Sequence, residues 1–206
     1  RVKPGILEQG ILLAFRFYFD QYVNLRPAFS LPKVHTPVDL KGTKMDSVVV
    51  RENTEDLYMC IGGTTETGEL ELPVEVSRGS YELKGRMSLK TDPACPFAAQ
   101  AAINSRPGVE RITRYACELA KKRDEDTVTV VSKSNAVSAL YGFFEENAKR
   151  VMADEYPELK YAMVNVDALC YHLVRNPAAY GVLLCPNLFG DIISDLQAGL
   201  AGGLGT

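Results

Sequence analysis

Three arginines in the first quarter of the chain could form a binding site for carboxylates. They are Arg16, Arg26 and Arg51, and the last directly follows the apolar run 48–50. A guanidinium group binds a carboxylate through two parallel hydrogen bonds, so arginines that the fold brings together can hold a dicarboxylic acid. Separate surface salt bridges would explain the same spacing, and the residues alone leave both interpretations open.

Two carboxylates near the end of the chain have the spacing of a metal site. Asp191 and Asp195 are four residues apart, which places both on one face of a helix. Like charges at this spacing repel each other unless a cation lies between them, and hard divalent ions such as Mg or Mn bind carboxylate oxygens. Asp167, expected at the end of a strand, could be a third ligand, because α/β proteins place their sites there. An ordinary solvated helix face is the alternative.

Two further residues could transfer protons. Lys133 lies in the run Ser-Lys-Ser-Asn, just past an expected strand, where a nearby metal would favour the neutral amine and let it act as a base. The hydroxyl of a buried tyrosine such as Tyr58 can act as a general acid. A solvent-facing lysine and a core tyrosine are the ordinary interpretations.

The composition excludes several classes of protein. The chain has 206 residues of which 46% are hydrophobic, enough to bury a core in one large or two small domains. A net charge of -3 offers no basic surplus for nucleic acid. No apolar run approaches the roughly 20 residues of a membrane span, so neither nucleic acid nor a membrane is an expected partner.

The elements that must position these residues alternate between helix and strand after Pro107. We expect a helix over 5–22, an extended segment over 23–31 and a buried strand over 47–50 in the first part. Later helices are expected over 109–122, 136–155, 168–174 and 189–200, and later strands over 127–131, 161–166 and 181–185. This alternation predicts an α/β fold with a mainly parallel sheet flanked by helices on both faces.

Segment 62–92 has a different pattern. It is rich in Thr, Glu and Gly, and apolar and polar residues alternate over 69–72 and 74–76. Such alternation predicts antiparallel strands with one wet face, and an exposed hairpin of this kind often pairs with another chain.

Together these segments resemble the isocitrate/isopropylmalate dehydrogenase family. The resemblance covers nearly the whole chain in order, with motifs at 10–16, 24–27, 50–58, 108–112, 133–135, 166–168 and 187–195. It implies an isopropylmalate-dehydrogenase-like fold in which 62–92 is an antiparallel clasp that pairs across a homodimer. Residues 1–25 would belong to the large nucleotide-side domain, 26–196 to the small substrate, metal and dimerisation domain, and 197–206 would return to the large domain.

The resemblance also assigns roles. The three arginines would hold the substrate, and the two aspartates four residues apart would bind Mg or Mn, with Asp167 supplied by the partner subunit. Lys133, also from the partner, would take the proton of the C2 hydroxyl. Tyr58 would protonate the enol left by decarboxylation, and Asn135 would lie near the nicotinamide. The implied reaction is oxidative decarboxylation of a small-molecule 2-hydroxy dicarboxylic acid with hydride transfer to NAD or NADP, in a homodimer with shared active sites.

The first helix bears on which acid is used. Isocitrate enzymes carry Ser and Asn, aligned on Arg16, where this chain has Gly10 and Leu12. An apolar Leu12 suits an alkyl substituent, which favours 3-isopropylmalate and leucine biosynthesis. Tartrate, D-malate or an isocitrate-like acid remains an alternative, because the run Arg-Glu-Asn-Thr-Glu at 51–55 is shared with those members.

Three features depart from the family pattern. Ser132 stands before the lysine where Asp or His is usual, and segment 62–92 looks longer than usual. The N-terminal glycine-rich start and the C-terminal adenosine loop are absent, so we expect an incomplete sequence that does not bind NAD properly by itself. The choice between NAD and NADP stays open, because the discriminating residues normally lie in that loop.

A non-catalytic regulatory subunit is the competing class of function. Such subunits typically lose a catalytic lysine, tyrosine or metal-binding aspartate, and this chain retains them, which favours an enzyme. A cytoplasmic location is expected, or an organelle matrix if a transit peptide precedes the chain.

Overall fold

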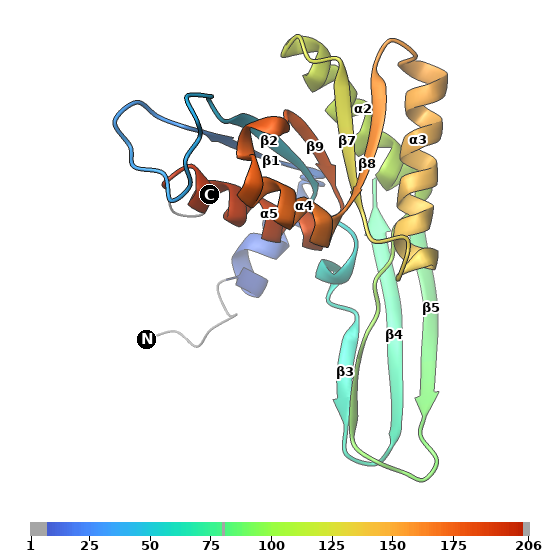
Figure 1. Ribbon diagram of the computed structural model, residues 1–206. Coiled ribbons are helices and arrows are strands. Elements are labelled where there is room, and N and C mark those ends of the chain that lie inside the picture. Colours follow the sequence, from blue (N-terminus) through green and yellow to red (C-terminus); the bar gives the residue numbers. More distant parts are fainter. Residues whose placement is uncertain (1–7, 80, 204–206) are drawn as a thin grey trace.

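The computed structural model describes residues 8–79 and 81–203 and is built around a five-stranded sheet in the order β1-β2-β9-β7-β8 (Figure 1). Strands β2, β9, β7 and β8 are parallel, and β1 is antiparallel to β2 at one edge. The edge position tolerates Pro27, which cannot donate a ladder hydrogen bond. The mainly parallel sheet is therefore confirmed, with β1 at Val23–Phe29, β2 at Asp46–Glu52, β7 at Thr127–Ser132, β8 at Lys160–Asn165 and β9 at Val182–Cys185.

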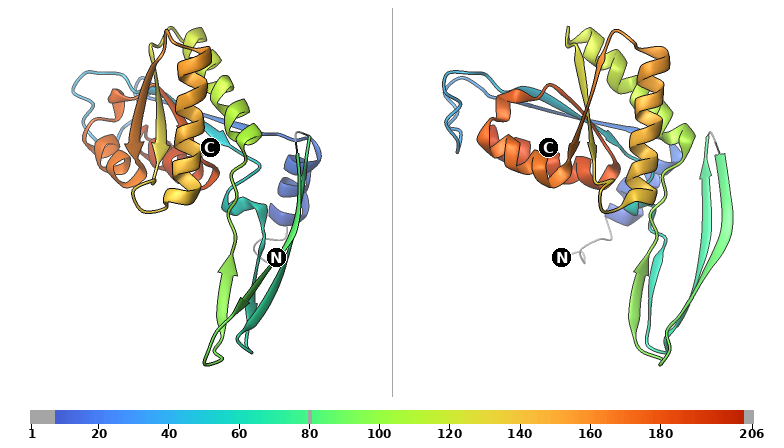
Figure 2. Two further views of the ribbon diagram at one scale, coloured as in Figure 1. Left: turned by 90° about the vertical axis from the view of Figure 1, so that its right-hand side faces the viewer. Right: turned by 45° about the vertical axis from the view of Figure 1, so that its right-hand side comes forward.

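Helices cover both faces of this sheet (Figures 1 and 2). Val48 and Val50 point to one face and pack with α2 and α3, whereas Val49 points to the other and packs with α4 and α5. A strand that is buried on both sides reads as a continuous apolar run, which is why 48–50 was recognisable in the sequence. The bounds are α2 Arg106–Lys122, α3 Phe143–Glu155, α4 Val166–Arg175 and α5 Asn187–Leu200. None of the helices in the described ranges is long and apolar enough to span a membrane.

An antiparallel arm extends away from the sheet (Figure 1). Strands β4 (Glu69–Arg78) and β5 (Tyr81–Lys90) form a hairpin, and β3 (Gly62–Thr65) pairs with β6 (Phe97–Gln100). On β4 the residues facing β3 and β6 are buried at alternate positions, in agreement with the predicted alternation. The excursion expected over 62–92 is confirmed, but it continues to Gln100 because β6 returns to pair with β3.

Some element ends differ from the expectation. The start of the helix expected over 5–22 lies outside the described residues, and the described part is a π-helix (Glu8–Leu13) followed by α1 (Ala14–Tyr18). It ends early because Asp20 adopts a positive φ of 45° and Tyr22 leads directly into β1. The helix expected over 136–155 is likewise broken, since a π-helix (Ser138–Gly142) precedes α3. Apolar spacing alone cannot distinguish such irregular turns from a regular helix.

Candidate active site

Arg51 lies at the carboxyl end of β2, where the neighbouring strand β9 leads into α5. Its side chain is 1% exposed, its Nε donates to Oδ1 of Asn187 at 2.9 Å, and its Nη1 binds Oδ1 of Asp191. Helix α5 passes so close that a Cβ at position 190 would lie 2.5 Å from Cγ of Arg51. Gly190 therefore allows the approach that brings Asp191 onto the guanidinium. Sequence reasoning gave Asn187 no individual role, although it lies two residues past the end of the expected strand.

Asp191 is the centre of the polar contacts at this strand end. Nη1 of Arg26 lies 3.1 Å from Oδ1 of Asp191 and donates to Oγ of Ser194 at 2.8 Å, while the hydroxyl of Tyr58 donates to Oδ2 of Asp191. Burial alone would raise the pKa of Asp191, but the hydrogen bond from Tyr58 and the charges of Arg51 and Arg26 hold it below its usual value. Asp191 is therefore an ionised acceptor. Ser194, missed in the sequence, lies one turn after Asp191 on the same helix face.

The surroundings of Tyr58 keep its hydroxyl protonated. It lies in a short 3₁₀ turn (Leu57–Met59), and the guanidinium carbon of Arg51 is 4.8 Å from the centre of its ring. Burial, followed by the hydrogen bond to Asp191, raises the pKa of the Tyr58 hydroxyl. The phenol thus stays protonated at neutral pH, as a general acid must.

Two guanidinium nitrogens at this cluster are buried and have no hydrogen-bond partner among the described residues. They are Nη1 of Arg16 and Nη2 of Arg51. Burial, and then the charge of Arg51, lowers the pKa of Arg16. Unpaired buried donors are uncommon in folded proteins, and carboxylate oxygens would satisfy both. We call Arg16, Arg26 and Arg51 the arginine cluster; its open donors suit an anionic ligand.

Lys133 and Asp167 form a second site at the carboxyl ends of β7 and β8. Nζ of Lys133 lies 2.8 Å from Oδ1 of Asp167, and this hydrogen bond lowers the pKa of the Asp167 carboxyl. Asp167 lies two residues past the end of β8, in the first turn of α4, in agreement with its expected place at a strand end. Within the described ranges, no hydrogen bond or ion pair connects Lys133 or Asp167 to the arginine cluster. A single chain thus holds these candidate residues in two separate groups.

The turn after β7 explains the unusual residue before the lysine. Ser132 is 1% exposed, and its Oγ accepts a hydrogen bond from the backbone N–H of Ser134 at 3.1 Å. Serine hydroxyls stabilise tight turns in this way. Ser132 thus holds the turn that presents Lys133, while Asn135 is exposed two residues further on.

The aspartates of α5 offer only part of a metal site within one chain. Asp191 and Asp195 lie on the same helix face, and Asp195 is 65% exposed with Oδ1 3.8 Å from Nη1 of Arg26. Among residues 8–79 and 81–203, no three His, Cys, Asp or Glu side chains converge on one point. The two carboxylates are hard oxygen donors of the kind Mg or Mn prefers, but such ions need about six oxygens, so these two side chains alone do not complete a site.

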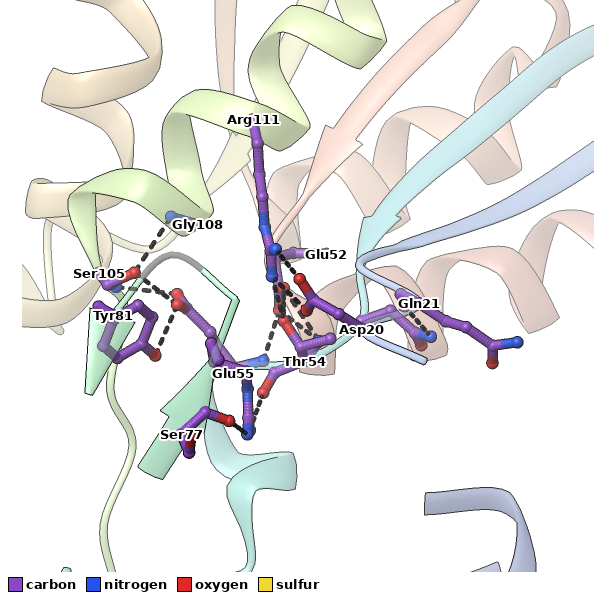
Figure 3. Close-up of polar contacts among 12 residues, drawn as sticks. Asp20, Gln21, Glu52, Thr54, Glu55, Ser77, Tyr81, Ser105, Gly108 and Arg111 are labelled. Carbon is purple, nitrogen blue, oxygen red and sulfur yellow. Dashed lines mark hydrogen bonds and ion pairs between the residues drawn. The ribbon is translucent and has the colours of Figure 1, made fainter. Parts of the chain in front are cut away.

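The segment between Arg51 and Tyr58 carries acids that sequence reasoning did not single out. Glu52, Glu55 and Asp56 are each 0–1% exposed, and hydrogen bonds from their surroundings hold all three. Figure 3 shows the contacts of Glu52 and Glu55. Glu52 accepts from the backbone of Thr54 and Glu55 at 2.8 to 3.0 Å. The signal available in the sequence was the run of charged residues directly after an apolar strand. Acids that are buried at such a place must be fully hydrogen-bonded.

Glu52 gives the site region a pH-dependent stability. Burial, then the charge of Glu55, raises the pKa of Glu52 to about 7. Because the folded state holds this proton more tightly than the unfolded chain, its contribution is present at low pH and is lost as pH rises through about 7. The unfolding free energy of the wild type minus that of Glu52→Gln should therefore fall by about 2 kcal/mol between about pH 5 and pH 8. Chemical denaturation at each pH measures this difference, and one that rises with pH contradicts the assignment.

The fold is that of an α/β protein, and Arg51 of the arginine cluster is buried at the carboxyl end of the parallel strand β2. A family model described as isocitrate/isopropylmalate dehydrogenase matches residues 4–206. The chain therefore belongs to the isocitrate/isopropylmalate dehydrogenase family, and the resemblance read from its motifs is confirmed.

Relatives and solved structures agree with this membership. A 3-isopropylmalate dehydrogenase of Clavibacter sepedonicus is 39% identical over 206 residues, which are 100% of this chain and 50% of that protein. One from Streptomyces coelicolor is 40% identical, over 99% of this chain and 51% of that protein. The crystal structure of isocitrate dehydrogenase from Methylococcus capsulatus matches with a TM-score of 0.72 and 32% identity, over 94% of this chain and 48% of that chain. The chain thus spans about half the length of the curated relatives it matches.

Proposed function

We propose that the whole protein oxidatively decarboxylates a 2-hydroxy dicarboxylic acid with NAD or NADP, and that the acid is 3-isopropylmalate. The observation that carries the proposal is the arginine cluster near the protonated Tyr58. Its buried donors Nη1 of Arg16 and Nη2 of Arg51 have no hydrogen-bond partner among the described residues and could bind an anion. Membership of the isocitrate/isopropylmalate dehydrogenase family supports the reaction class, and relatives named 3-isopropylmalate dehydrogenase support the substrate.

In this proposal each side chain acts on a stated atom of the acid. The arginine cluster binds the two carboxylates, which orients C2 and C3. Lys133 of a second copy takes the proton of the C2 hydroxyl while C2 loses a hydride, which yields a ketone. Loss of the C3 carboxylate as carbon dioxide then leaves an enolate, and Tyr58 donates its proton to C3, which restores the ketone. Bound NAD or NADP would accept the hydride, near Asn135.

The aspartates would hold a divalent metal. Asp191 and Asp195 provide two carboxylates, and we propose that Asp167 of a second copy would provide a third. Family members typically use a divalent metal with NAD(P). Such an ion would polarise the new ketone and favour loss of carbon dioxide.

The separation of the two residue groups supports a homodimer with shared active sites. Lys133 and Asp167 lie apart from the arginine cluster in one chain, so the complete set requires a second copy. We propose that the arm formed by β3 to β6 pairs between subunits. We also propose that residues 1–25 and 197–206 belong to the nucleotide-side domain and residues 26–196 to the substrate domain. The fold offers an exposed hairpin suited to such pairing.

Turnover by the whole protein tests the proposed function directly. Nucleotide reduction is followed by near-ultraviolet absorbance with Mg or Mn, on 3-isopropylmalate, D-malate, tartrate and isocitrate in parallel, with NAD and with NADP. Strongest turnover on 3-isopropylmalate, abolished by a chelator, is expected. Turnover confined to tartrate or D-malate would keep the mechanism and discard the substrate. A folded dimer that turns over none of the four would favour a non-catalytic regulatory subunit.

Leu12 should determine the preference for an alkyl substituent. It is 61% exposed and lies one helical turn before Arg16, so its side chain can cover a ligand that the arginine holds. Leu12→Ala should raise the KM for 3-isopropylmalate by about tenfold, because apolar contact with the isopropyl group is lost. The KM for D-malate, which has no alkyl group, is the internal control and should change little. An equal rise for both acids contradicts this role.

A further inference from the structure

The base of the hairpin contacts the helix that carries Arg16. Arg78 is the last residue of β4, and its guanidinium carbon lies 4.4 Å from the centre of the Phe17 ring. Nη2 of Arg78 also donates to the backbone carbonyl of Thr54 at 2.8 Å. One side chain therefore connects the hairpin, helix α1 and the segment between Arg51 and Tyr58.

A second arginine, Arg111, also contacts Thr54 and binds the turn that ends α1. Arg111 of α2 grips both carboxylate oxygens of Asp20 at 2.6 and 3.1 Å, and its Nη2 donates to Oγ1 of Thr54 at 2.9 Å (Figure 3). Asp20 lies in the turn that ends α1, two residues before Tyr22, whose ring lies 4.6 Å from the Arg111 guanidinium. Thr54 thus joins the anchors of both arginines.

Helix α1 depends on such anchors. It has five residues, none of them buried, and no side-chain cap at its start. Even with the π-helix Glu8–Leu13 that precedes it, this helical segment is short and has little stability of its own, so its position depends on contacts with its neighbours. Burial, and then the charge of Arg51, lowers the pKa of Arg16, so a carboxylate bound at the arginine cluster would relieve an unfavourable placement of this cation.

We propose that Arg78 is a positioning residue that holds Arg16 in place for the dicarboxylic acid, so that the hairpin controls the affinity of the arginine cluster. This inference rests on the proposed function. Arg78 itself does not touch the acid; it acts through Phe17 and Thr54. Because the hairpin is also the segment proposed to pair with a second copy, subunit pairing and substrate affinity would depend on the same contact.

The test compares two arginines of the hairpin in the whole protein. Arg78→Met removes the charge and the hydrogen bond to Thr54, and should raise the KM for the acid about tenfold with kcat changed less than about threefold. Arg86→Met is the matched control, because Arg86 is 75% exposed on β5 and lies 3.6 Å from Glu71. It removes the same charge and should leave KM unchanged. Arg78→Lys keeps a cation over Phe17 and should recover part of the affinity.

Calorimetric titration of 3-isopropylmalate with Mg, without nucleotide, gives the affinity independently of turnover. A weaker Kd for Arg78→Met but not for Arg86→Met supports the positioning role even if no acid is turned over, in which case only the proposed function fails. If Arg78→Met turns over the acid with unchanged KM and Kd, the positioning role is wrong while the proposed function stands. Equal losses in both variants, or no binding of the acid by the unsubstituted protein, overturn it as well.

Discussion

Arg51→Lys is expected to lower kcat/KM of the whole protein by about 10³-fold, because a buried site loses the guanidinium hydrogen bonds that a lysine cannot replace. Arg51 connects Asn187, Asp191 and the ring of Tyr58, and its buried Nη2 has no hydrogen-bond partner among the described residues. A lysine keeps the positive charge but offers no planar fork, so it cannot serve Asn187, Asp191 and a carboxylate together. Initial rates of nucleotide reduction over a range of acid concentrations measure the loss.

A surface arginine provides the control for this substitution. Arg114 grips Glu155 with two hydrogen bonds of 2.7 Å, but its side chain is 41% exposed. Arg114→Lys should leave kcat/KM within about twofold of the wild type, because solvent-exposed ion pairs contribute little. If Arg51→Lys, with an unfolding midpoint close to that of the wild type, lost less than about tenfold, the arginine cluster would not be the substrate site.

Lys133→Ala is expected to lower kcat by about 10³-fold or more, since a positioned general base contributes about 10² to 10⁴. The amine lies 2.8 Å from Asp167 in a turn held by Ser132, so its removal deletes the base while the turn is retained. The KM for the acid should change little, because the arginine cluster provides most of the binding. Steady-state kinetics separate the two constants.

Lys160 is the matched control for the lysine substitution. It pairs with Asp126 at 2.6 Å near the opposite end of β8, and both side chains are exposed. Lys160→Ala removes a similar pair and should leave kcat unchanged. Equal activity of Lys133→Ala and Lys160→Ala would exclude Lys133 as the base.

The fold was largely predictable because buried parallel strands and amphipathic helices have distinct patterns. The apolar run 48–50 and the strands and helices after Pro107 were recognised from these patterns alone. The first helix was overestimated, because its apolar spacing continues through Phe19 while Asp20 reverses the backbone. The partner of β3 was missed because β6 is a short, neutral strand without alternation.

The candidate site was predictable as residue types but not as geometry. The arginines and aspartates could be named from charge and spacing, and the structure brings Arg26, Arg51 and Asp191 together. The residues that hold them were missed: Asn187 orients Arg51, and Thr54 joins the anchors of Arg78 and Arg111. Their roles depend on contacts between segments far apart in the sequence, which no local pattern records.

Mixing two inactive variants tests the central claim that one active site combines the arginine cluster of one subunit with Lys133 and Asp167 of another. Arg51→Lys and Lys133→Ala are co-expressed with different tags, and the mixed dimer is isolated. Before isolation, random pairing makes half of the dimers mixed. One of the two sites in each mixed dimer has both residues intact. The unfractionated mixture should therefore regain about a quarter of wild-type turnover. Turnover no greater than the average of the two separate variants, from dimers shown to contain both, would contradict the shared site.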